Sequence, residues 1–78
     1  MTDEDLVKEC VSGNAIAQKK FYDLFARKMM GVCLRYSNDY DEAQDILQDG
    51  FVKIFNKLPA FESKGSLEGW VRRIIVNT

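Results

Sequence analysis

Histidine is absent from this 78-residue sequence, and cysteine and proline are scarce, with two residues and one residue respectively. Without an imidazole, nearly every zinc, haem and histidine-base site is excluded, and neither a Ser–His nor a Cys–His nucleophile can be assembled. No glycine-rich phosphate loop is present either. The sequence therefore predicts a protein that is not an enzyme, holds no metal or cofactor and takes no small-molecule substrate.

Long apolar runs are also missing. None approaches the ~18 residues of a membrane span, and no signal peptide opens the sequence. Cys10 and Cys33 both fall on apolar helical positions, which favours reduced, packed thiols over a disulfide or a redox pair. These features predict a cytoplasmic protein without membrane insertion.

The sequence does hold four helical segments, separated by short turn signals. We expect helices over about residues 3–11, 14–36 and 41–58, and a fourth that begins near Ser66 as its N-cap. No alternating strand pattern occurs, so the predicted fold is all-α, a compact bundle of about four helices in one domain, residues 1–78. Because the apolar pattern is still running at Thr78, we also expect this polypeptide to be part of a longer protein.

The apolar positions of each segment predict its buried face. In the first segment they are Leu6, Val7, Cys10 and Val11. In the second they are Phe21, Tyr22, Leu24, Phe25, Met29, Val32, Cys33 and Tyr36, spread over more than one face as expected for a central helix. In the third they are Ala43, Ile46, Leu47, Gly50, Phe51, Ile54 and Leu58, and in the fourth Leu67, Trp70, Val71, Ile74, Ile75 and Thr78.

Charge is segregated along the chain, although the net charge is only −1. Residues 1–36 carry six basic and five acidic side chains, residues 37–50 none and five, and residues 51–78 five and two. An acidic block thus precedes a basic end, and such asymmetry is informative about binding partners.

The acidic block places Asp41, Asp45 and Asp49 on one face of the third segment, at positions i, i+4 and i+8. Each like-charge pair costs about 0.2–0.5 kcal/mol. Gln48 and Val52 share this face, opposite the apolar stripe. Two interpretations remain open at this point, a solvated helix face or a docking face for a basic partner.

The basic end combines a short loop with the fourth segment. Its candidate nucleic-acid-binding residues are Phe61, Lys64, Gly65, Ser66, Trp70, Arg72, Arg73 and Asn77. Arginine can contact phosphate, asparagine can pair with a base edge, and aromatic rings can stack unpaired bases. Each residue also has a plainer structural interpretation, and for Phe61 and Trp70 that is packing in the core.

Two strings carry a resemblance to a known family. They are DEAQDILQDGFVKIFNKL, residues 41–58, and GWVRRIIVNT, residues 69–78, with Phe61 between them. Together they resemble region 2 of bacterial sigma-70 family sigma factors, most closely the extracytoplasmic-function type, and the resemblance covers essentially the whole chain. The family's second domain, a helix-turn-helix region 4 that recognises the −35 element, is not part of this sequence.

The resemblance implies two partners. The face with Asp41, Asp45, Gln48, Asp49 and Val52 would bind the clamp coiled coil of the RNA polymerase β′ subunit. The loop and fourth segment would bind the non-template strand of the promoter −10 element and hold a flipped base, so that melting is a binding event in transcription initiation. An anti-sigma factor is a further implied partner. The alternative is a helical protein–protein interaction module, such as an anti-sigma-like adaptor, without DNA binding.

Overall fold

The computed structural model describes residues 2–62 and 64–78, and within them the chain forms four α-helices, one 3₁₀ helix and no strand. The α-helices are α1 (Asp3–Val11), α2 (Ala15–Arg35), α3 (Tyr40–Lys57) and α4 (Leu67–Val76). The 3₁₀ helix η1 (Leu58–Ala60) directly continues α3. The predicted all-α bundle of about four helices is confirmed.

Each of these α-helices is preceded by a residue whose side chain caps its N-terminus. The capping side chains belong to Thr2, Asn14, Asp39 and Ser66. In each case a side-chain oxygen accepts a hydrogen bond from a backbone N–H of the first turn, an arrangement worth about 1 kcal/mol. Ser66 was the expected cap, and its Oγ accepts from the N–H of Gly69 at 3.1 Å. At the other end α4 stops at Val76, so the apolar pattern that continues to Thr78 extends beyond the helix.

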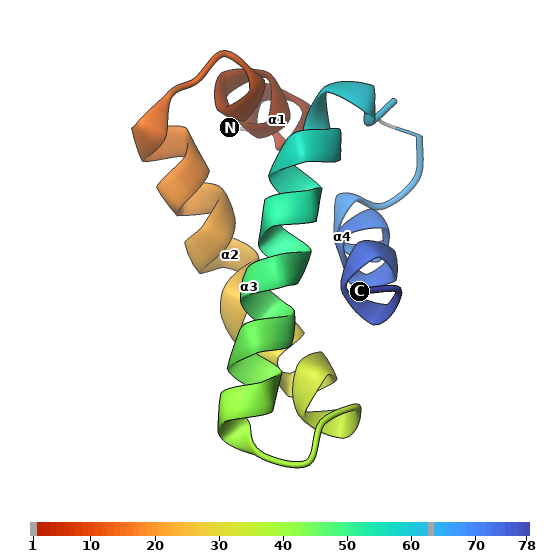
Figure 1. Ribbon diagram of the computed structural model, residues 1–78. Helices are drawn as coiled ribbons and strands as arrows, with labels where there is room; N and C mark the ends of the chain where they lie inside the picture. The colour runs from red at the N-terminus through yellow and green to blue at the C-terminus, as the bar shows by residue number, and fades with distance from the viewer. Residues whose placement is uncertain (1, 63) are drawn as a thin grey trace.

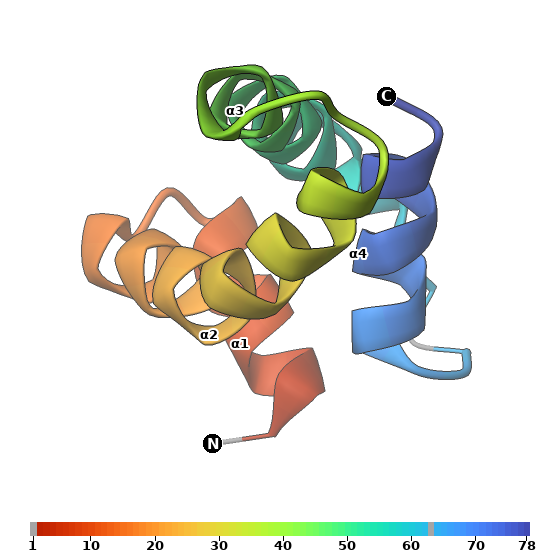
Figure 2. The same ribbon diagram turned by 90° about the horizontal axis from the view of Figure 1, so that it is seen from below.

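The two long helices, α2 and α3, lie side by side, and the other elements pack around them (Figures 1 and 2). Helix α1 crosses the end of the pair where α2 begins and α3 ends, and it also contacts η1. Helix α4 contacts both α2 and α3. Helix α2 therefore touches the three other α-helices, as its apolar residues on more than one face predicted.

The core is built from the predicted apolar stripes. The fully buried side chains include Phe21, Met29, Ile54, Leu58, Leu67, Val71 and Ile75. Aromatic rings join α2 to α3, with the Phe21 and Phe55 ring centroids 5.5 Å apart and those of Tyr22 and Phe51 4.8 Å apart. Cys10 and Cys33 are buried, free thiols. None of the helices in residues 2–62 and 64–78 is both long and apolar enough to span a membrane.

Four residues assigned to buried faces are exposed instead. Leu24 lies on the solvent side of α2 and is 56% exposed, and Tyr36 follows the last residue of that helix and is 64% exposed. Val11 ends α1 beside η1 and is 46% exposed. Thr78 lies past the end of α4 and is also exposed. Leu24 and Val11 lie within their helices but are not covered by a neighbouring element, whereas Tyr36 and Thr78 lie past the ends of theirs.

Gly50 faces α4, and the end of an isoleucine side chain of α4 occupies the space beside it. A Cβ atom added at Gly50 would collide with Cδ1 of Ile75, a buried side chain of α4. By contrast, a Cβ at Gly31 in the middle of α2 would meet no atom of another element within 4 Å. The close packing at Gly50 brings the second half of α3 against α4, and this contact shapes the candidate site.

Candidate functional site

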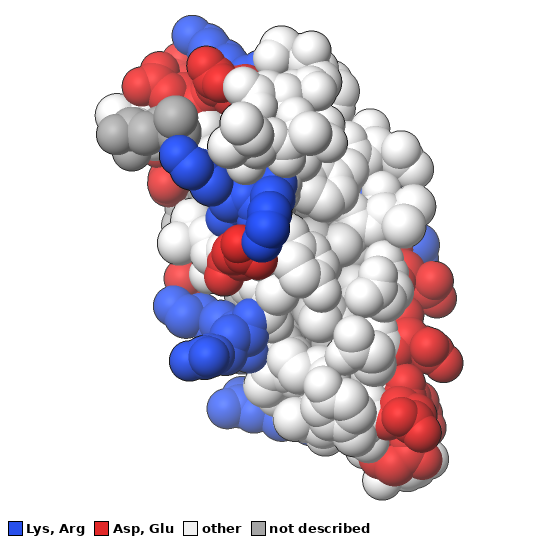
Figure 3. All heavy atoms as spheres, turned by 90° about the vertical axis from the view of Figure 1, so that its left-hand side faces the viewer, with Lys and Arg blue, Asp and Glu red and all other residues white. Residues whose placement is uncertain are grey.

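The acidic residues of α3 form an exposed face, as the sequence predicted. Its members, Asp41, Asp45, Gln48, Asp49 and Val52, are all exposed, and Val52 is 61% exposed. Within the described residues, none of the three aspartates takes part in an ion pair. We call this set the acidic face. Over the lower half of Figure 3, acidic side chains gather along one edge of the molecule and basic side chains along the other.

A second surface lies in a groove between α3 and α4, with a volume of about 460 Å³. It is lined by Lys53, Lys57, Trp70, Arg73, Ile74 and Asn77. Trp70 and Ile74 are half-buried, whereas the three cations and the asparagine are exposed. No ion pair with a carboxylate of the described chain involves the three cations. We call this hollow the basic groove.

Three of the predicted nucleic-acid-binding residues thus come together in one hollow, namely Trp70, Arg73 and Asn77. Lys53 and Lys57 were missed by the sequence analysis. These two lysines are spaced i, i+4 within the basic end of the sequence, and this spacing places them on one side of a helix. They become neighbours of Arg73 only because α4 packs against α3. The basic groove is therefore formed by α3 and α4, whereas the sequence predicted a site on the loop and the fourth helical segment.

The remaining predicted residues lie outside the basic groove. Phe61 packs against Trp70, with ring centroids 5.1 Å apart and planes tilted by 56°, so these rings do support each other in the core. Gly65 has a φ of +81°, a left-handed turn that favours glycine. Lys64 is exposed and pairs with Glu62 at 3.6 Å.

Ser66 is already engaged as the cap of α4, through its hydrogen bond with Gly69. Arg72 is exposed on α4 but does not line the basic groove. One turn before it, Glu68 pairs with Lys28 of α2 at 2.8 Å. That pair is largely exposed and contributes at most about 1 kcal/mol, so its main consequence is local charge neutralisation where α2 meets α4.

Neither thiol is an activated nucleophile. Burial raises the pKa of Cys10, and the nearby Glu9 carboxylate raises it further. Burial also raises the pKa of Cys33, against a smaller opposing effect of a backbone hydrogen bond. Since the thiolate is the reactive form, both side chains are poor nucleophiles. Their role is packing.

Comparison with known proteins agrees with this architecture. The family model "Sigma-70 region 2" matches residues 21–78. The RNA polymerase sigma-H factor of Pseudomonas aeruginosa is 31% identical over 80 residues, which cover 97% of this chain. The ECF RNA polymerase sigma-E factor of Haemophilus influenzae is 28% identical over the full chain, and the ECF RNA polymerase sigma factor SigW of Bacillus subtilis is 25% identical over 91% of it.

The chain spans about two fifths of the length of these relatives, 39%, 41% and 38% respectively. The family match covers α3, α4 and most of α2, and so includes both the acidic face and the basic groove. The all-α fold and the family match agree. The chain belongs to the sigma-70 family of RNA polymerase sigma factors, as a region 2 domain of the extracytoplasmic-function type.

Proposed function

We propose that residues 1–78 act as one non-enzymatic module that docks on RNA polymerase through the acidic face and binds the non-template strand of the −10 element in the basic groove. Both steps serve promoter recognition and opening in transcription initiation. The observation that carries the proposal is that two exposed surfaces of opposite charge share the long helix α3, the acidic face on α3 alone and the basic groove between α3 and α4. An adaptor that bound only proteins would dock an acidic partner on the second surface, so binding of DNA is what separates the two functions.

The acidic face suits a basic helical partner such as the clamp coiled coil of the polymerase β′ subunit. Asp41, Asp45 and Asp49 repel one another along α3, at about 0.2–0.5 kcal/mol for each neighbouring pair. A basic partner would relieve this repulsion and steer association. Val52 adds an exposed apolar contact at the end of the same row. Because the face is complete on one helix, docking requires no rearrangement of the core.

The basic groove suits a single strand better than a duplex. The half-buried indole of Trp70 offers a surface on which an unpaired base can stack, worth about 1–3 kcal/mol. The Asn77 amide can pair with a base edge, while Arg73 and the two lysines can contact phosphates. Extruding a base from the stack costs a few kcal/mol, which these contacts can offset. Strand opening is then a binding event without covalent chemistry.

The docking half of the proposal is tested by charge reversal on α3. We expect Asp45→Lys and Asp49→Lys each to abolish capture by a purified clamp coiled coil, because they place a cation opposite basic residues. Asp23→Lys is the matched control, since it makes the same change on an exposed carboxylate of α2. Circular dichroism verifies that every variant folds. Undiminished capture by both α3 variants would contradict the docking assignment.

The DNA half is tested with labelled non-template −10 oligonucleotides and their duplexes. We expect Asn77→Ala and Arg73→Ala to weaken binding of the single strand, and the arginine change also to flatten its salt dependence. Lys19→Ala is the control, because that lysine lies on α2 and pairs with Asp23 at 2.9 Å. Equal binding of single strand and duplex would rule out the flipped-base mechanism. Capture by the clamp with no DNA binding would favour the adaptor.

A further inference from the structure

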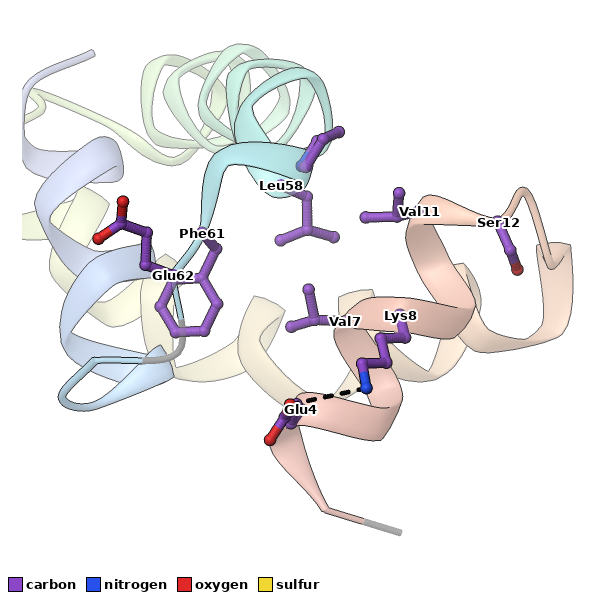
Figure 4. A pocket seen from close by; sticks show the side chains of 9 residues that line it. Glu4, Val7, Lys8, Val11, Ser12, Leu58, Phe61 and Glu62 are labelled. Atoms are coloured by element: carbon purple, nitrogen blue, oxygen red, sulfur yellow. Dashed lines mark ion pairs between the residues drawn. The ribbon is translucent and has the colours of Figure 1, made fainter.

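A third hollow lies between α1 and η1, apart from the acidic face and the basic groove. Its volume is about 460 Å³, and its apolar lining comprises Val7, Val11, Leu58, Pro59 and Phe61. In Figure 4 the labelled apolar side chains from the two elements point toward a shared space. We propose that this α1–η1 groove binds a basic amphipathic helix of a partner protein.

The floor and the walls of the α1–η1 groove differ in exposure. Val7 and Leu58 are 6% and 1% exposed, so the floor is the surface of the core itself. Val11 is 46% exposed and Phe61 is half-buried, and these side chains form the walls. A concave apolar surface between two helical elements is the feature that receives the apolar face of a helix in groove-type recognition. Its volume falls within the range of about 300–1,000 Å³ typical of ligand pockets.

Carboxylates rim the α1–η1 groove on both walls. Glu4 lies on the α1 side and Glu62 on the opposite side. The one lysine of the rim, Lys8, already pairs with Glu4 at 3.6 Å, as the dashed line in Figure 4 marks. Lys64, which follows, pairs with Glu62 at the same distance. Each of the two carboxylates that line the groove is thus paired with a lysine, so any excess negative charge beside the groove must come from other residues of α1.

Further carboxylates of α1 extend this acidic rim. Asp3 lines an adjoining hollow together with Glu4, while Asp5 and Glu9 line another beside Lys8. The acidic residues of the first turn also interact favourably with the helix dipole, and this accounts for part of their clustering. Glu62 has no such role, because it lies outside any helix on the far wall. Because Lys64 offsets Glu62, the excess negative charge beside the groove is that of Asp3, Asp5 and Glu9 on α1.

This charge pattern selects among possible occupants. Five carboxylates line the groove and its adjoining hollows, those of Asp3, Glu4, Asp5, Glu9 and Glu62, and they outnumber Lys8 and Lys64 by three, which disfavours nucleic acid and anionic membrane surfaces. A helix that inserts apolar side chains at i and i+3 or i+4, and carries Lys or Arg on either side of them, satisfies both the apolar lining and the rim. The partner is thus defined by an apolar stripe flanked by cations.

The first experiment uses a designed amphipathic peptide with a leucine stripe flanked by lysines, and a control peptide in which every lysine is glutamate. Amide shifts of the ¹⁵N-labelled domain map the contact. We expect the lysine peptide to shift amides around Val11 and Phe61, and the glutamate peptide to bind at least tenfold more weakly. Equal binding of both peptides, or shifts confined to α3, would overturn the proposal.

Variants separate the α1–η1 groove from the acidic face. We expect Val11→Asp to weaken the lysine peptide about tenfold, because it places a charge on the apolar wall. Leu24→Asp makes the same change on an exposed leucine of α2 and should leave binding unaltered. Asp45→Lys should leave it nearly unaltered too, even though that variant is expected to lose the polymerase clamp. Undiminished binding by Val11→Asp would contradict the proposal.

Self-association is the competing outcome. Sedimentation of the free domain over a range of concentrations is compared with that of Val11→Asp. A domain that stays monomeric at the concentrations of the peptide titration supports an external partner. If the domain dimerises and Val11→Asp abolishes the dimer, a second copy occupies the groove and the proposal is wrong.

Discussion

The two lysines of the basic groove provide the sharpest test of the proposed DNA contact. Replacing Lys53 and Lys57 with glutamine removes two of the three cations that line the groove and leaves Arg73 in place. Both lysine side chains are exposed, so the change does not disturb the core. The domain should fold as before and lose part of its electrostatic contact with a single strand.

The magnitude follows from counterion release. Each phosphate contact to a single strand contributes about 0.7 to the slope of log K against log salt concentration. Three cations predict a slope of about −2.1, and Arg73 alone about −0.7. Between 50 and 200 mM salt, affinity should therefore fall about 20-fold for the unaltered domain and about threefold for the double variant.

Fluorescence anisotropy of a labelled single strand, titrated at four or five salt concentrations, measures both slopes. The matched control replaces Lys19 and Lys20 of α2 with glutamine, which alters net charge by the same amount away from the groove. We expect the control to retain most of the slope. If both double variants lose the same slope, the strand responds to overall charge and the basic groove is not the contact.

Three further predictions concern the scaffold. Gly31→Ala should raise the free energy of unfolding by about 0.5–1 kcal/mol, because alanine has the higher helix propensity. Gly50→Ala has the same gain, but overpacking against the buried Ile75 costs about 1–3 kcal/mol and should lower the free energy of unfolding overall. Urea midpoints measure both, and equal signs would contradict the packing argument. Ser66→Ala should cost about 1 kcal/mol by the same assay, and Ser66→Gly only a few tenths; an unchanged midpoint for the alanine variant would contradict the cap. Cys10 and Cys33 should react with a thiol reagent only as fast as the domain opens. Because burial raises the pKa of both thiols, the folded domain keeps them protonated to higher pH than the unfolded chain does, so the free energy of unfolding should fall as pH rises past the ordinary thiol pKa. Fast labelling of the native domain, or constant stability through that range, would count against their burial.

The sequence predicted those features that depend on a single helix. Helix periodicity and capping are local properties, so the range 3–11 and the cap at Ser66 agree with the structure, and the other helix boundaries differ by one or two residues. The acidic face is local for the same reason. Side chains spaced i, i+4 and i+8 share one side of a helix whatever packs against the other side.

Tertiary packing decided the features that join two elements. Periodicity shows which face of a helix is apolar, but not whether a neighbour covers the whole of it. Val11 and Leu24 were therefore predicted to be buried from their positions on apolar faces, but they are exposed in the structure. For the same reason the sequence did not predict the basic groove. Lys53 and Arg73 are 20 positions apart and line the same groove only because α4 packs against α3. The sequence by itself determined the helices, their caps and the acidic face, whereas the two grooves exist only through contacts between helices distant in sequence.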